Sequence, residues 1–176
     1  RDGQIFWIRP AERAVIICED FHIPRSLQKL RKKNKFRFTT DVAFRAVVES
    51  CADRRETWIC RDIEDLFGQL HGLGFAHSVE AWDPSGKLVG GVYGLSIGGV
   101  FAGESMFHLE PGASKLCIVA LVEHLTNLGY GTLDCQQQTP HMQRFGARMI
   151  SDENYSALLS SQAAPLEWHA KTFPTD

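Results

Sequence analysis

Apolar and polar positions in the first part of the chain predict a strand, a helix and a second strand. Residues 14–18 (AVIIC) are apolar and rich in β-branched side chains, and residues 36–39 (FRFT) alternate with the period of a strand. Residues 24–34 between them carry leucines three positions apart, and Pro24 suits the first position of a helix. We therefore expect a basic helix between two strands.

Two amphipathic helices are expected next. Apolar residues recur on one helix face within residues 43–51, and Thr40 is a candidate N-cap for that helix. Residues 63–70 repeat apolar side chains at i, i+3, i+4 and i+7, and Gly72 or Gly74 is expected to end this second helix.

The centre of the chain has the pattern of consecutive strands. Residues 75–82 and 87–95 are strand-like, and the DPSG sequence at 83–86 predicts a hairpin turn between them. A Gly-Gly pair then predicts a second turn into a strand at residues 100–105. The pattern therefore predicts an antiparallel meander.

The last part of the chain returns to alternating helices and strands. Residues 113–128 predict an amphipathic helix ended by Gly129, and residues 132–136 predict a short strand behind it. A short helix, a strand near residues 147–150 and a helix capped by Asp152 follow. The whole is an α+β layout, a mixed and largely antiparallel sheet flanked by helices, which is compatible with a GNAT-like acyltransferase fold.

Composition favours one intracellular domain. The 176 residues are 44% hydrophobic and contain no repeat or Gly/Ser linker, so we expect a single domain over residues 1–176. The five cysteines are irregularly spaced, as is typical of reduced thiols, and the histidines lack the spacing of zinc sites. No long apolar run or signal peptide is present. We therefore expect a cytoplasmic protein with no membrane contact, no metal and no cofactor.

The formal net charge of −2 hides a concentration of positive charge. No acidic residue occurs from Phe21 to Thr40, and this stretch holds over a third of the 19 lysines and arginines. Such a helix supplies the salt-sensitive attraction to phosphate that nucleic-acid binding requires, although a merely solvated helix face has the same composition. The candidate RNA-binding residues are Arg25, Lys29, Arg31, Lys32 and Lys33.

Candidate catalytic side chains lie on two predicted strands. Asp134 and Gln136 are separated by one residue, so we expect them on the same strand face. A carboxylate that accepts from the glutamine amide would orient the amide oxygen toward an attacking amine. Glu104 has apolar neighbours, where an ionised carboxylate is costly unless it is paired. Spacing alone also allows ordinary polar residues at strand ends.

Candidate ligand contacts are open to two interpretations. Val92, Phe101, Ile118 and Leu121 suit either the core or an apolar pocket. Trp58 lies between charged residues and a short apolar pair, so it suits either stacking on a nucleobase or a half-buried anchor.

Eight short motifs, taken together, are far more specific than any one of them. They are HIPRSLQKL (22–30), TWI (57–59), LHGLGFAHSVEAW (70–82), LVGGVYG (88–94), FAGESMF (101–107), ASK (113–115), LDCQ (133–136) and FGA (145–147). In order and spacing they resemble the leucyl/phenylalanyl-tRNA–protein transferases, over a stretch from about Ile5 to Leu159.

This resemblance implies a GNAT-like domain that transfers Leu or Phe from its tRNA to the N-terminal Arg or Lys of an acceptor protein. The transfer marks the acceptor for degradation and uses neither metal nor acetyl-CoA. The resemblance implies that Asp134 and Gln136 are the catalytic pair and that Glu104 is an active-site glutamate. It implies that Arg25, Lys29 and Lys32 bind tRNA. The residues implied to surround the aminoacyl-adenosine end are Trp58, Val92, Phe101, Ser114, Ile118 and Leu121.

The chain departs from the family pattern at three places. Nothing matches the family's N-terminal region, which helps to close the substrate site. Residues 7–13 are WIRPAER where the family usually has WWSPDPR, and Thr139 stands where the family has Asn. These departures allow a relative with a different acceptor.

Two further alternatives are a GNAT N-acetyltransferase that uses acetyl-CoA and an RNA-binding module without activity. An acetyltransferase would need a Gly-rich pyrophosphate loop at a helix start, and residues 111–114 (PGAS) match one poorly. The presence of all three candidate catalytic residues argues against an inactive module.

Overall fold

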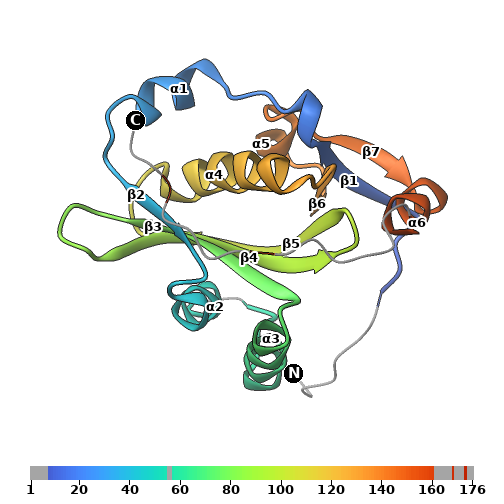
Figure 1. The fold of residues 1–176 in the computed structure, drawn as a ribbon, viewed down its shortest axis with the longest axis horizontal. Helices are drawn as coiled ribbons and strands as arrows, with labels where there is room; N and C mark the ends of the chain where they lie inside the picture. The colour runs from blue at the N-terminus through green and yellow to red at the C-terminus, as the bar shows by residue number, and fades with distance from the viewer. Residues whose placement is uncertain (1–7, 55–56, 161–167, 169–172, 174–176) are drawn as a thin grey trace.

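A single seven-stranded sheet organises the computed structural model of the chain, with strand order β2-β3-β4-β5-β6-β1-β7 (Figure 1). The structure describes residues 8–54, 57–160, 168 and 173. The strands are β1 (Glu12–Ile17), β2 (Arg37–Thr40), β3 (Ala76–Trp82), β4 (Leu88–Ile97), β5 (Val100–His108), β6 (Thr132–Gln136) and β7 (Arg148–Ser151). The helices are α1 (Arg25–Arg31), α2 (Phe44–Ala52), α3 (Arg61–Gly72), α4 (Ala113–Leu128), α5 (Pro140–Gln143) and α6 (Asp152–Ser160), with a 3-10 turn η1 (Cys18–Asp20).

The sheet is mixed but mainly antiparallel. Strands β2 to β5 pair antiparallel in sequence order, so the predicted meander is confirmed. Strand β5 then pairs with β6 in parallel, across the connection made by α4. Strand β1 enters between β6 and β7 and pairs antiparallel with both. The α+β fold class predicted from the sequence is confirmed.

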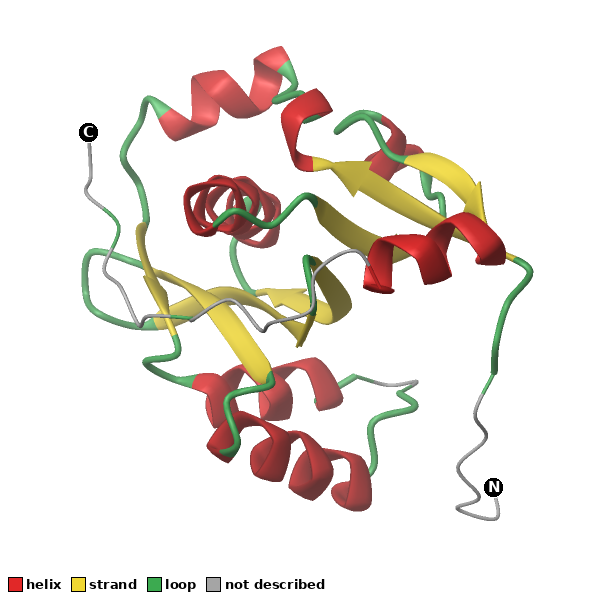
Figure 2. Ribbon diagram, turned by 45° about the vertical axis from the view of Figure 1, so that its right-hand side comes forward, coloured by secondary structure: helices red, strands yellow, loops and turns green. Residues whose placement is uncertain are grey.

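Helices cover both faces of the sheet. Helix α4 lies against one face with α1 outside it, and α2 and α3 lie against the other (Figures 1 and 2). The apolar residues of α4 predicted that this helix packs on the sheet. In the structure Leu121 and Leu125 are fully buried in the main core. The α2 and α3 stripes build a second core around Val47 and Phe67. Helix α6 packs on β1 and β7 through the buried Tyr155.

Most predicted boundaries agree with the structure, but two predicted helix caps are wrong. Thr40 is a buried residue of β2, and Ala43 occupies the N-cap of α2. Asp152 lies inside α6, where the Ser151 hydroxyl accepts from the Asn154 backbone N–H at 3.3 Å. Thr40 is held in the sheet by its place in β2, and Asp152 already belongs to the first turn of α6, so neither is free to cap.

Two turns follow the predicted chemistry. The Asp83 carboxylate accepts backbone N–H groups across the β3–β4 hairpin, and Gly86 has φ 83° there. Gly129 ends α4 with φ 87°, as the sequence predicts.

Among the described residues, no helix combines the length and the apolar character that crossing a bilayer requires.

Candidate active site

A cavity opens where two neighbouring strands separate. The parallel pairing of β5 with β6 ends at Ala102 opposite Asp134, so the following residues of the two strands diverge. The cavity has a volume of about 960 Å³. Side chains from β5, β6, α4 and α5 line it, together with the end of α2 and the segment that follows α2.

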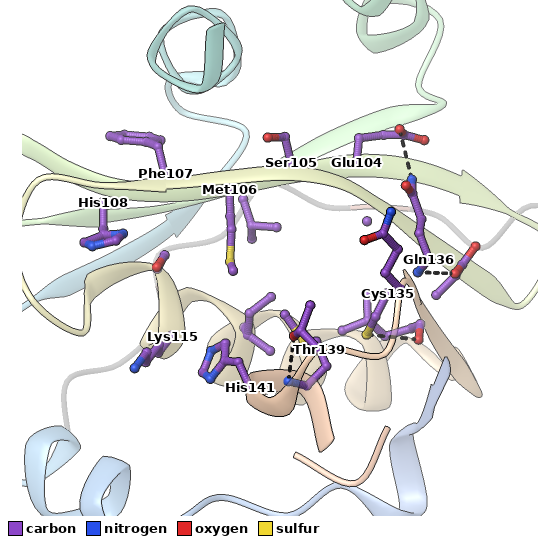
Figure 3. A pocket seen from close by; sticks show the side chains of 18 of the residues that line it. Glu104, Ser105, Met106, Phe107, His108, Lys115, Cys135, Gln136, Thr139 and His141 are labelled. Atoms are coloured by element: carbon purple, nitrogen blue, oxygen red, sulfur yellow. Dashed lines mark hydrogen bonds between the residues drawn. The ribbon is translucent and has the colours of Figure 1, made fainter. Parts of the chain in front are cut away.

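A bulge in β5 directs Glu104 toward this opening. Tyr93 of β4 lies opposite Ser105, whereas the next residue, Gly94, lies opposite Gly103, so Glu104 has no partner across the ladder. Glu104 and Ser105 consequently project on the same side of β5 although they are neighbours in sequence, and Met106 projects on the other (Figure 3). Gly94 and Gly103 lie beside this bulge, and glycine inside a strand is a weak sequence sign of one.

Asp134 is fully buried, with both carboxylate oxygens occupied. Its Oδ2 accepts from the Arg13 guanidinium at 2.8 Å, and its Oδ1 accepts from the Gln136 backbone N–H at 2.7 Å. Tyr155 adds a third contact: burial raises the pKa of this phenol, and the charge of Asp134 and a hydrogen bond to it raise it further. Asp134 is therefore held as an acceptor at the centre of a closed network.

Gln136 has an unusual backbone conformation at the end of β6. Its φ is 62°, in the left-handed region that residues other than glycine rarely adopt. The Asp134 carboxylate holds the N–H of this strained residue. Its side-chain Nε2 donates to Glu104 Oε2 at 3.2 Å (Figure 3). The carboxylate that orients the Gln136 amide is thus Glu104, whereas the sequence pattern pointed to Asp134.

The pKa of the Glu104 carboxyl group is raised. Burial raises the pKa of its carboxyl group above the ordinary value of 4.5, although the hydrogen bond from Gln136 acts in the opposite direction. The negative charge of Asp134 raises the pKa further, and Arg13 lowers it. A carboxylate with raised pKa on an open cavity is suited to accept a proton.

The predicted substrate contacts divide into two groups. Trp58, Val92, Ser114 and Ile118 line the cavity, and the indole of Trp58 is 56% exposed, which suits stacking on a flat ligand. Phe101 and Leu121 are fully buried in the main core and do not line the cavity. These two residues therefore pack in the core, and the structure does not support direct contact between them and a substrate.

One side of the cavity is basic, a feature that the sequence analysis missed. Lys115 of α4 and Arg144, directly after α5, both line it. Burial lowers the pKa of His141 in α5, and the positive charges of these two residues lower it further. The His141 Nε2 atom is buried and has no hydrogen-bond partner among the described residues. Thr139 caps α5 by accepting from the Met142 backbone N–H at 3.2 Å.

The predicted tRNA-binding residues lie on and after α1, away from the cavity lining. All five side chains are exposed: Arg25, Lys29, Arg31, Lys32 and Lys33. The segment itself contains no acidic residue, but one of its positive charges is paired in the folded chain, because Arg31 forms an ion pair with Glu123 of α4. The remaining four positive charges are presented to solvent.

Arg13 and Tyr155 also contact Asp134, and neither was predicted from the sequence. Arg13 lies 121 residues before Asp134, and its guanidinium carbon lies 4.8 Å from the centre of the Tyr155 ring. In the sequence, Arg13 resembles an ordinary surface charge and Tyr155 an ordinary apolar position of an amphipathic helix. Pairing of β1 with β6 brings Arg13 to Asp134, and only the strand order contains that information.

Comparison with known proteins gives a consistent result. The sequence model of the family "Leucyl/phenylalanyl-tRNA protein transferase" matches residues 15–160. Three relatives bear the name leucyl/phenylalanyl-tRNA–protein transferase. The relative from Rubrobacter xylanophilus is 46% identical over 90% of this chain and 83% of its own length. The Herpetosiphon aurantiacus relative is also 46% identical, with the same coverage of both chains. The Pseudomonas fluorescens relative is 44% identical over 90% of this chain and 72% of its own length.

The fold also resembles a solved structure of low sequence identity. The structure of L-PGS from Bacillus licheniformis superposes with a TM-score of 0.51 and 14% identity, covering 70% of this chain and 44% of that one. This likeness supports the GNAT-like fold. The family model that matches residues 15–160, and the relatives of 44–46% identity, show that the chain belongs to the leucyl/phenylalanyl-tRNA–protein transferase family.

Proposed function

We propose that the chain transfers leucine or phenylalanine from an aminoacyl-tRNA to the N-terminal amine of an acceptor protein. One observation carries the chemistry: Glu104 and Gln136 are hydrogen-bonded to each other on the wall of an open cavity. Asp134 supports them from the interior. Because the reaction needs charged tRNA, we place it in the cytoplasm.

The reaction is an exchange of an ester for an amide. The acceptor nitrogen attacks the ester carbonyl carbon, the ester C–O bond breaks, and the ribose oxygen leaves as a hydroxyl with one proton from the amine. An α-amine has a pKa near 8, so about a tenth of it is neutral at pH 7. Orientation of ester and amine supplies much of the acceleration.

Glu104 and Gln136 are suited to receive the amine. Donation of the Gln136 Nε2 to Glu104 leaves the Gln136 amide oxygen available to accept from an acceptor N–H. The raised pKa of Glu104 suits this carboxylate to accept a proton. Both oxygens of Asp134 already accept hydrogen bonds, so Asp134 is less available to the amine. In this proposal Asp134 positions Gln136 and takes no proton itself.

The tRNA would approach along the basic side of the molecule. The exposed charges of α1 attract the phosphate backbone, and Lys115 with Arg144 neutralises phosphate near the acceptor end. Trp58 then stacks on the terminal base. The apolar side chains of Val92 and Ile118 face the same cavity and accommodate leucine or phenylalanine.

The acceptor assignment rests on the family resemblance. We assign N-terminal Arg or Lys as the acceptor residue, and the tagged protein is thereby marked for degradation. The structure does not favour acetyl-CoA as the donor. An acetyltransferase would bind pyrophosphate at the start of α4, and there the Leu30 side chain of α1 packs against the backbone of Gly112.

The experiment supplies radiolabelled Leu-tRNA, Phe-tRNA or acetyl-CoA with matched peptides that differ only at residue one. We expect label from both tRNAs to enter peptides that begin with Arg or Lys, and none to enter peptides that begin with Glu or Ala. Transfer from acetyl-CoA alone would overturn the proposal. Transfer from tRNA to other N-termini would keep the reaction and reject the acceptor assignment.

A further inference from the structure

Three potential metal ligands converge outside the active-site cavity. Asp41 directly follows β2, His71 lies in the last turn of α3, and His77 is in β3. One ligand atom from each residue lies within 4.8 Å of the other two. Strand β2, which Asp41 follows, pairs with β3, which carries His77, and His71 approaches from the helix α3.

Each imidazole has one nitrogen committed to a backbone carbonyl. The His71 Nδ1 lies 2.8 Å from the Ala76 carbonyl oxygen, and the His77 Nε2 lies 3.0 Å from the Gly74 carbonyl oxygen. A nitrogen that faces a carbonyl must carry the proton, so Nε2 of His71 and Nδ1 of His77 are the nitrogens left to coordinate. Donation of the second ring N–H to a carbonyl is the usual outer contact of a metal-bound histidine.

The Asp41 carboxylate is also oriented for coordination. Its Oδ1 accepts from the Ser78 backbone N–H at 2.8 Å, and its Oδ2 lies 2.7 Å from His77 Nδ1. Asp41 has φ 58°, a left-handed conformation that aspartate adopts more readily than most residues other than glycine. The two hydrogen bonds fix the direction of its carboxylate.

Aromatic stacking fixes the planes of both imidazoles. The His71 ring stacks on Phe44 with centroids 4.1 Å apart, and the His77 ring stacks on Trp168 with centroids 4.3 Å apart. The two imidazole planes are nearly perpendicular, at 84°, so they do not stack on each other. Ligand rings that are already fixed lose little conformational entropy when an ion binds.

A groove gives access to the cluster. Asp41 and His71 line a cavity of about 820 Å³ between α2 and α3, whereas His77 is 4% exposed behind them. Glu64 and Asp65 line the same groove and add negative charge along the path of entry. Two ligands thus face the groove and one closes the back of the site.

We propose that Asp41 Oδ2, His71 Nε2 and His77 Nδ1 bind one Zn²⁺ ion, with the fourth coordination position open to the groove. Two imidazoles and one carboxylate are a ligand set that Zn²⁺ accepts, and three protein ligands leave one position for water. The ion would take the place of the hydrogen bond between His77 Nδ1 and Asp41 Oδ2. This site is independent of the aminoacyl transfer proposed above.

The test uses the full chain after removal of metals with a chelator, titrated with Zn²⁺ by calorimetry and with Co²⁺ by visible absorption. We expect one equivalent to bind tighter than about 10 μM. Two variants remove a ligand and keep the outer hydrogen bond. In His71→Asn the amide nitrogen replaces Nδ1 opposite Ala76, and in His77→Gln it replaces Nε2 opposite Gly74. Each should weaken binding at least about 100-fold, beyond the effect of losing an outer contact.

The matched control is His22→Asn, because His22 is exposed and lines neither cavity. It should bind Zn²⁺ like the parent chain. Circular dichroism of the metal-free variants checks folding, and Asp41→Asn replaces any variant that fails to fold. The proposal is overturned if the folded parent chain binds no Zn²⁺ in this range. It is overturned equally if His71→Asn binds Zn²⁺ as the parent does, since the ion would then lie elsewhere.

Discussion

The buried Asp134 of the candidate active site and the outer surface of α1 use charge in opposite ways. Asp134 has no exposed surface, and each of its carboxylate oxygens has a fixed partner. On the surface, Lys29 and Lys32 are exposed, and Arg31 shares its charge with Glu123. Charge in the interior sets geometry and is insensitive to salt, whereas charge on the surface attracts a polyanion and is screened by salt. Substitutions at Asp134 should therefore change the rate of transfer, and substitutions on α1 should change the affinity for tRNA.

The largest expected effect is that of Asp134→Asn. The new amide presents an N–H to either Arg13 or the Gln136 backbone, so one of the two contacts must break. The rate of transfer from bound tRNA should fall about 10³-fold, as for the loss of a preorganised polar group. The dissociation constant for tRNA, measured by filter binding, should stay within about 2-fold. An equal loss of tRNA affinity would remove the distinction between the two regions.

The second effect is on the pH profile of Glu104→Gln. Loss of the proton acceptor should slow single-turnover transfer about 10²-fold. In the parent chain, burial raises the pKa of Glu104 above 4.5, and the carboxylate gains a proton as the pH falls through that raised value. The parent rate should therefore decline on this acid limb, and the variant should lose the limb and keep the one set by the acceptor amine near pH 8. An unchanged acid limb in the variant would assign it to another group.

The double variant Lys29→Ala with Lys32→Ala should act on binding alone. Loss of two phosphate contacts should weaken tRNA binding about 10-fold and reduce the slope of log affinity against log salt by about 2. The rate at saturating tRNA should not change. A lower saturated rate with unchanged affinity would show that α1 takes part in the chemistry.

The smallest effect is expected for Arg31→Ala, which should weaken tRNA binding less than about 3-fold, because Glu123 already occupies this guanidinium. The companion variant Glu123→Gln should strengthen binding by a similar factor, since it releases Arg31. Measurement at two salt concentrations checks both. A loss as large as that of the double lysine variant would show that Arg31 leaves Glu123 when tRNA binds.

The secondary structure was largely predictable because local signals agree with the final packing. The apolar stripe of α4 and Gly129 mark the helix correctly, and the turn chemistry at residues 83–86 marks the hairpin. Thr40 and Asp152 were misassigned as caps, because a suitable side chain near a helix start does not reveal which residue tertiary contacts will place there.

The candidate active site was only partly predictable. The family motifs select Asp134, Gln136 and Glu104, but the connections among them depend on two backbone irregularities, the β5 bulge and the left-handed Gln136. The bulge lies beside Gly94 and Gly103, and glycine inside a strand is only a weak sign of a bulge, whereas nothing in the sequence marks the left-handed conformation of Gln136. The proximity of His71 and His77 to Asp41 could not be read from their spacing in the sequence, because these residues meet only after β2 pairs with β3.

The ion pair between Arg13 and Asp134 has a consequence for synthesis on the ribosome. Strand β1 leaves the ribosome before the other strands described, yet both of its neighbours in the sheet, β6 and β7, are among the last to emerge. The buried carboxylate therefore lacks its counter-charge until the sheet closes around β1, and such long-range pairing forms late. A nascent or truncated chain should thus be catalytically silent, and aminoacyl transfer is expected only from molecules that have completed folding.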